Sequence, residues 1–221
     1  GYEFTSSVIL LAALPPLLNL FMRPNLNSVV IKAAYKKMVK ISLTGVVAFA
    51  VTLLLHAYLR AQNVFAGLKI IWNEDVQRRT FGNPANFDPA YTPSLDASVT
   101  EVLQIYFLKW ITLVISFGIP ELFLITFTTI SLLLLMVFLL VTILFRGAFD
   151  HGSAIQKLHK SGLALYVYAY SIPFSWFILA KSHSFIHTHI NFVLWYLMSV
   201  PLFFWLTYEN LTWILSKTRS R

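Results

Sequence analysis

Long, uninterrupted apolar runs are the feature that most limits how this chain can fold. The clearest one extends from Leu122 to Phe145 and contains no Asp, Glu, Lys or Arg. A helix needs about 20 apolar residues to cross the hydrocarbon layer of a bilayer, and this run is long enough. The apolar residues follow one another without alternating, which is typical of membrane helices and not of barrel strands.

The composition supports the same class of protein. Hydrophobic residues make up 57% of the 221 residues, and charged residues only 12%. Soluble domains carry about 25% charged residues. We therefore predict an all-α, polytopic integral membrane protein, with residues 1–221 forming a single membrane domain.

Five transmembrane helices are preferred from the sequence, and six are possible. The segment Val99–Phe117 decides between them, because it can either cross the membrane or lie in the interface. The other spans are clearer, although Pro15 and Pro16 should kink the first one. They are Val8–Met22, Ile41–Leu59, Leu122–Phe145, Gly162–Ala180 and Ile190–Leu215.

The distribution of Lys and Arg favours five spans. With five spans, eleven Lys and Arg residues flank the membrane on one side and five on the other, whereas six spans invert the bias. Basic residues are enriched on the cytoplasmic side of membrane proteins. The predicted orientation therefore has the N-terminus outside and the C-terminus on the cytoplasmic, or equivalent inner, side.

Amphipathic segments are expected between the spans. Residues 23–40 carry five basic residues and no acid, and we interpret them either as a cationic helix on anionic lipid or as an ordinary inner loop. Residues 60–104 are predicted to be an extramembrane or interfacial segment, and Ser98 and Glu101 have the spacing of a capping box. The expected lipid-headgroup contacts are Lys32, Lys36, Lys37 and Lys40.

Histidines gather near the end of the fourth span. With five spans, His183, His187 and His189 lie on the same side of the membrane as His56. Neutral imidazoles at such spacings can bind metal ions or haem. However, the histidine segment has no acidic residue to support a ligand, so a hydrated loop is the preferred interpretation. No cofactor is expected.

Three other charged groups are candidates for function. Glu121 follows Gly118 and Pro120, and a buried carboxylate there could move protons or bind a cation, with Lys109 as a possible partner. The alternative is a helix-start carboxylate at the headgroups. Arg78 and Arg79 could contact a partner, or their neighbouring acids could neutralise them.

The sequence contains no phosphate-binding glycine loop, no GxSxG and no HExxH. The net charge of +8 is attributed to membrane flanks and not to nucleic-acid binding. The preferred hypothesis is a non-catalytic subunit of a membrane complex, whose partners are the bilayer and other membrane proteins. The alternative is a small transporter or lipid-handling protein that uses Glu121 and residues 23–40, and the third hypothesis is a histidine-ligated metal or haem protein.

Overall fold

The computed structural model describes residues 4–108, 111–114, 124–127, 129–149, 151–187 and 198–219. Nearly all of these residues are helical, which confirms the helical class. The larger helices are α1 (Thr5–Ala12), α2 (Pro15–Met22), α3 (Ser28–Ala61), α4 (Val64–Ile70), α7 (Val99–Leu108), α8 (Thr129–Phe149), α9 (Ala154–Lys160), α10 (Leu163–Leu179) and α13 (Val200–Arg219). The shorter ones are the π-helix η2 (Ile71–Val76), α5 (Gln77–Arg79), the 3-10 helices η3 (Pro84–Asn86) and η4 (Pro89–Tyr91), α6 (Thr92–Asp96) and α11 (Lys181–Ile186).

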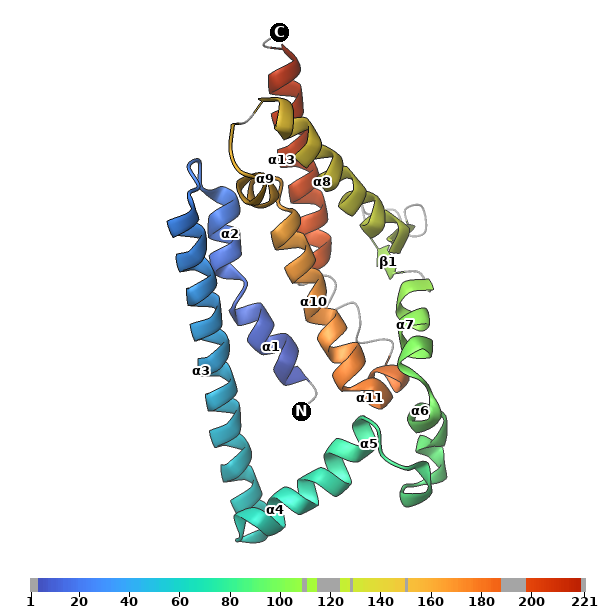
Figure 1. The fold of residues 1–221 in the computed structure, drawn as a ribbon. Helices are drawn as coiled ribbons and strands as arrows, with labels where there is room; N and C mark the ends of the chain where they lie inside the picture. The colour runs from blue at the N-terminus through green and yellow to red at the C-terminus, as the bar shows by residue number, and fades with distance from the viewer. Residues whose placement is uncertain are drawn as a thin grey trace.

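The helices form an elongated bundle with two distinct ends (Figure 1). The α2–α3 connection, α9 and the C-terminus lie at one end, which we call the α9 end. Helices α4, α5, α6 and α11 lie at the other, which we call the α4 end. Helices α3 and α10 run from the α9 end to the α4 end, whereas α8 and α13 run from the middle of the molecule to the α9 end.

Two described segments are long and apolar enough to cross a membrane. They are Thr5–Met22, which includes the break at the proline pair, and Ser28–Ala61. Helices α9 and α10 together would be a third span, bent by 63° at their junction. The apolar part of α8, Leu133–Gly147, is shorter. The described residues thus support two or three spans, and the five expected from the sequence are not shown.

Helix α3 corrects the expected separation of a cationic interfacial helix from the second span. It is continuous over 34 residues, which corresponds to about 51 Å of helix. Asn27 caps its N-terminus by accepting a hydrogen bond from the Val30 amide, and Gln62 ends it with a left-handed backbone, φ 54°. No proline lies between these two caps, so nothing breaks the helix near Lys40.

A two-stranded hairpin replaces part of two predicted helices. Strand β1 (Ile111–Val114) pairs antiparallel with β2 (Leu124–Phe127), so the helix predicted from Val99 to Phe117 ends at Leu108. Helix α8 accordingly begins at Thr129, several residues later than the predicted start at Leu122. Both strands contain β-branched residues, which favour extended backbone.

Helix α10 is the centre of the core. Trp176 and Phe177 are fully buried, and α10 contacts α1, α2, α7, α8, α9 and α11. The ring of Phe4 stacks on Trp176 with centroids 5.2 Å apart. These contacts hold the N-terminal helices against α10, more than 150 positions later in the sequence.

Side-chain hydrogen bonds to backbone carbonyls reinforce this packing. Pro15 and Pro16 end α1, as the sequence predicted, and the Tyr168 hydroxyl donates to the Leu10 carbonyl in the last turn of α1 (3.0 Å). The Ser7 hydroxyl donates to the Ile172 carbonyl (3.1 Å), next to Pro173 inside α10. Both bonds join α1 to α10, and the bond from Tyr168 adds a donor to a carbonyl in the last turn of α1.

The corner between α9 and α10 depends on Gly162. Its φ of 81° lies in the left-handed region, where a side chain is strained. A Cβ there would also lie 2.4 Å from Leu206 Cδ2 of α13. The sharp bend and the close approach of α13 therefore both require glycine.

We expect Gly162→Ala to lower the free energy of unfolding by about 2–4 kcal/mol, because it adds backbone strain and a steric clash. Gly147→Ala in α8 is the matched control, since no atom lies within 4 Å of its Cβ position. The control should be neutral or stabilising by up to about 1 kcal/mol. Thermal unfolding of both variants in detergent would measure this difference, and equal melting temperatures would contradict it.

Candidate functional site

The α4 end is built around a buried lysine. Lys181 begins α11 directly after α10, and only 4% of its surface is exposed. Its Nζ donates hydrogen bonds to the carbonyls of Leu95 (2.6 Å) and Ala97 (2.5 Å). One lysine therefore satisfies two carbonyls at the end of α6 and fixes that segment to the core.

Charges and an aromatic ring around Lys181 partly offset the cost of burying its ammonium group. Burial lowers the pKa of the ammonium group, and the negative charges of Asp96 and Glu101 oppose part of that shift. The ammonium also lies 5.4 Å from the centre of the Phe81 ring. These neighbours favour a charged lysine in a largely dry environment.

The capping box that the sequence predicted forms beside this lysine. The Ser98 amide donates to Glu101 Oε2 (2.6 Å), and the Glu101 amide donates to Ser98 Oγ (3.1 Å). The hydrogen bonds from Ser98 are the main reason that the pKa of Glu101 lies below its usual value. Helix α7 therefore starts at a fixed position against α11.

Serines on α11 and α6 complete the attachment. The hydroxyls of Ser182 and Ser94 are hydrogen-bonded at 2.8 Å, and both side chains are buried. Residues 73–97, which lie within the predicted extramembrane or interfacial segment 60–104, therefore contain short helices, and α11 contacts α5 and α6 among them. The sequence did not single out Lys181 as a functional residue, although it is the only Lys, Arg, Asp or Glu between Lys160 and Glu209.

Asp75 is the centre of a second charged cluster at the same end. Arg60 at the end of α3 binds both acids of η2: it contacts Asp75, and it donates to Glu74 Oε2 at 2.5 Å. Arg78 and Arg79 each lie 4.0 Å from Asp75. The sequence left two roles open for Arg78 and Arg79, which were contact with a partner and neutralisation by neighbouring acids. The described contacts with Asp75 fit the second role.

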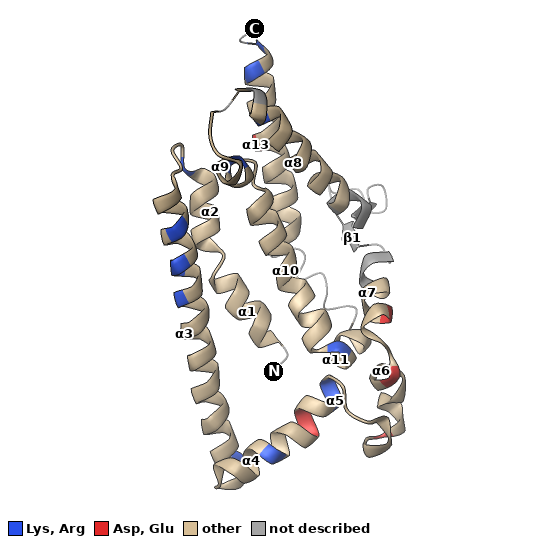
Figure 2. Ribbon diagram, in the orientation of Figure 1, with Lys and Arg blue, Asp and Glu red and all other residues tan. Residues whose placement is uncertain are grey.

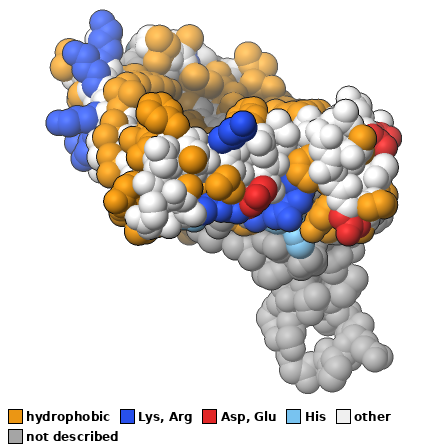
Figure 3. Space-filling model, turned by 90° about the horizontal axis from the view of Figure 1, so that it is seen from below, with side chains coloured by type: hydrophobic (Ala, Val, Ile, Leu, Met, Phe, Trp, Pro, Cys, Tyr) orange, Lys and Arg blue, Asp and Glu red, His pale blue; other side chains and the backbone are white. Residues whose placement is uncertain are grey.

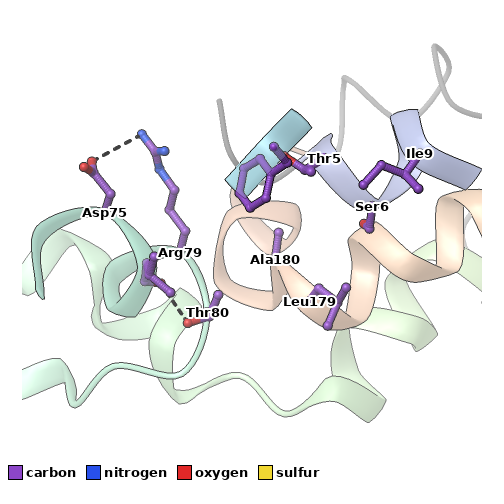
Figure 4. A pocket seen from close by; sticks show the side chains of 10 residues that line it. Thr5, Ser6, Ile9, Asp75, Arg79, Thr80, Leu179 and Ala180 are labelled. Carbon is purple, nitrogen blue, oxygen red and sulfur yellow. Dashed lines mark hydrogen bonds and ion pairs between the residues drawn. The ribbon is translucent and has the colours of Figure 1, made fainter. Parts of the chain in front are cut away.

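An apolar cavity of about 350 Å³ lies beside this cluster, between α1, α3, α5 and the end of α10. Its walls include Ile9, Phe49 and Leu179. Asp75 and Arg79 line it on one side, as Figure 4 shows. Its volume falls within the range of small-molecule sites, about 300–1,000 Å³, and its lining suits an apolar group.

Seen from the α4 end, the surface is mixed (Figure 3). Hydrophobic side chains surround basic ones, and acidic side chains gather toward the α6 side. Phe65, Trp72 and Phe81 are exposed large apolar residues of this end. Phe65 lies on α4 and Trp72 on the π-helix η2 that follows it, whereas Ile71 of the same segment is buried.

The structure places two of the four candidate histidines together. The rings of His183 and His187 are 4.3 Å apart, and His183 also meets the edge of Trp176. Within the described ranges, no group of three or more His, Cys, Asp or Glu residues could hold a metal ion. His56 lies exposed on α3, and His189 lies outside the described residues, so the four-histidine site stays a prediction.

Of the remaining predicted residues, some are described by the structure and others lie outside the described ranges. Glu121 and Lys109 lie outside the described residues, so their proposed pairing is not tested. The four lysines of the cationic segment are described, and all are exposed on α3. Elsewhere on this part of α3, Ile31 and Met38 are buried, whereas Tyr35 between them is exposed. The exposed lysines are Lys32, Lys36, Lys37 and Lys40.

Comparison with known proteins identifies no relative. No family model matches the chain, and neither a curated protein nor a solved structure is significantly similar to it. The interpretation of its function therefore rests on its own residues.

We expect Lys181→Met to destabilise the α4 end, because two buried carbonyls lose their donor. Each unsatisfied group costs about 1–3 kcal/mol, so the loss of two bonds costs about 2–6 kcal/mol and should lower the melting temperature by roughly 4–24 °C. Limited proteolysis should cut residues 80–98 faster than in the unmodified protein. Lys69→Met, at an exposed lysine of α4, is the control and should change neither measurement. Unchanged proteolysis of Lys181→Met would show that the lysine does not hold this segment.

Proposed function

We propose that this protein is a non-catalytic subunit of a membrane complex and that it binds a neighbouring membrane protein through α3. The observation that carries the proposal is how little of α3 is packed within its own chain. Only Ile31, Met38 and Ala57 are buried among its 34 residues. Large apolar side chains such as Leu43, Val47 and Leu55 are exposed, so most of this helix surface is available to lipid or to another protein.

One exposed face of α3 favours a protein partner over lipid. Thr44, Ala48 and Thr52 are four residues apart, so they lie on one side of the helix, and all three are exposed. Small residues at this spacing allow a second helix to approach closely in a membrane. Both threonine hydroxyls donate to carbonyls of their own helix, which leaves a face without unsatisfied donors.

The charges of the two ends support the orientation in this proposal. Lys and Arg are concentrated on upper α3, α9 and the C-terminal helix, whereas most acids lie at the α4 end (Figure 2). Basic flanks favour the cytoplasmic side. We therefore place the α9 end and the C-terminus inside, and the α4 end outside. Helices α3 and α10 lead away from the α9 end and α8 and α13 lead back toward it, which is consistent with this orientation (Figure 1).

The partner face on α3 can be tested with two matched substitutions. Ala48→Phe should block close approach of a partner helix and reduce the recovery of co-purifying membrane proteins about tenfold, which corresponds to 1.4 kcal/mol. Ala50→Phe is the control, because Ala50 is also exposed but points to the opposite side of the helix. Affinity purification in mild detergent with quantitative mass spectrometry measures both. A chain that purifies alone, with no partner for either variant to lose, would refute the proposal.

Single-cysteine labelling tests the orientation, because the chain has no native cysteine. Cysteines at the exposed positions Phe65 and Ile186 should react with an impermeant maleimide from outside. A cysteine at exposed Ile155 in α9 should react only after the membrane is opened. Labelling of positions 155 and 186 from the same side would contradict this orientation.

A further inference from the structure

A second cavity, of about 550 Å³, lies at the α9 end of the molecule. The α2–α3 connection, α8, α9 and α13 all contribute to its lining, so four separated parts of the chain meet there. A smaller cavity of about 260 Å³ is also lined by Lys160, on α9. The larger cavity falls within the range of about 300–1,000 Å³ that is typical of small-molecule sites.

Cations predominate in the lining of the larger cavity. Arg23, Arg146 and Lys160 contribute three positive charges, and Glu209 contributes the one carboxylate. Arg146 is buried, with 7% of its surface exposed, and its guanidinium lies 3.9 Å from the centre of the Trp213 ring. Arginine held against an aromatic ring in this way still presents N–H groups in its plane, which suit phosphate oxygens.

A buried amide in the lining lacks a hydrogen-bond partner for one of its atoms. The Asn210 side chain is 1% exposed, and its Nδ2 donates to the carbonyls of Ser161 (2.9 Å) and Leu206 (2.8 Å). Exchanging the amide oxygen and nitrogen would set an oxygen against two carbonyls, so this assignment is fixed. Oδ1 finds no hydrogen-bond donor within the described part of the chain. A buried acceptor without a donor is costly, which points to a ligand that supplies one.

The position of the cavity indicates where such a ligand comes from. Trp205 and Trp213 line it, and tryptophan is enriched at the headgroup level of membranes. Trp205 donates from Nε1 to Glu209 Oε1 (3.2 Å) and packs edge-on against Phe21, so its ring is contacted on two sides. The surrounding end also carries the basic excess that attracts anionic lipid.

We propose that this cavity binds the headgroup of one anionic glycerophospholipid that carries a hydroxyl donor. The phosphate lies between Arg23, Arg146 and Lys160. The headgroup hydroxyl donates to Asn210 Oδ1, and Glu209 accepts a second donor where the headgroup has one. This site is separate from the exposed lysines of α3, and it does not depend on the proposed partner of α3.

Native mass spectrometry of the purified protein with added lipids tests the proposal. Phosphatidylglycerol should bind with one retained molecule per chain. Phosphatidylmethanol has the same charge but no headgroup hydroxyl, and it should bind about tenfold more weakly, as expected for one hydrogen bond of 1.4 kcal/mol. Equal binding of the two lipids would overturn the role of Asn210.

Two double variants with the same loss of charge locate the site. Arg23→Gln with Lys160→Gln should weaken phosphatidylglycerol binding at least tenfold. Lys69→Gln with Arg219→Gln removes two exposed charges that do not line the cavity and should leave binding unchanged. Equal losses of phosphatidylglycerol binding in both variants would mean that general surface charge causes the binding, and would refute the proposed site.

Soluble probes distinguish a lipid from a free phosphate compound. Inorganic phosphate and glycerol phosphate, at millimolar concentration, should neither displace phosphatidylglycerol nor raise the melting temperature. The lipid assignment would be refuted if either soluble probe raised the melting temperature while phosphatidylglycerol did not. The cavity would then be a site for a soluble phosphate compound.

Discussion

Hydrogen bonds from side chains to backbone carbonyls at helix breaks hold this structure together. Within an apolar environment, every carbonyl that a helix leaves exposed needs a donor. The breaks occur at the proline pair, at Gly162 and at the end of α6, and the donors come from Tyr168, Asn210 and Lys181. Gln156 adds another, from α9 to the Leu26 carbonyl (2.5 Å). Each bond joins segments that are far apart in the sequence, so the breaks also determine which helices lie together.

The sequence could predict the parts of the fold whose cause lies in neighbouring residues. Local patterns were reliable where the cause was local: the proline break, the Ser98–Glu101 capping box and the helix from Gly162 to Ala180 were predicted closely.

Features that depend on distant partners could not be predicted from the sequence. Lys181 belongs to a segment that reads as a hydrated loop, and its burial depends on carbonyls more than 80 positions away. The cavity at the α9 end likewise brings Arg23, Arg146 and Asn210 together from three separate regions. A lone charge in a long apolar stretch is the one signal in the sequence that could have drawn attention to Lys181.

The uninterrupted length of α3 has a consequence for how the protein sits in a bilayer. The hydrocarbon layer is about 30 Å thick, and residues 41–61 of α3 are long enough to cross it at 1.5 Å per residue. The preceding residues, 28–40, continue the same helix for about 20 Å, and a tilt of α3 brings them into the headgroup region. Because α3 has no internal break, the distance between the α4 end and the lysines near the start of α3 is set by the length of one continuous helix.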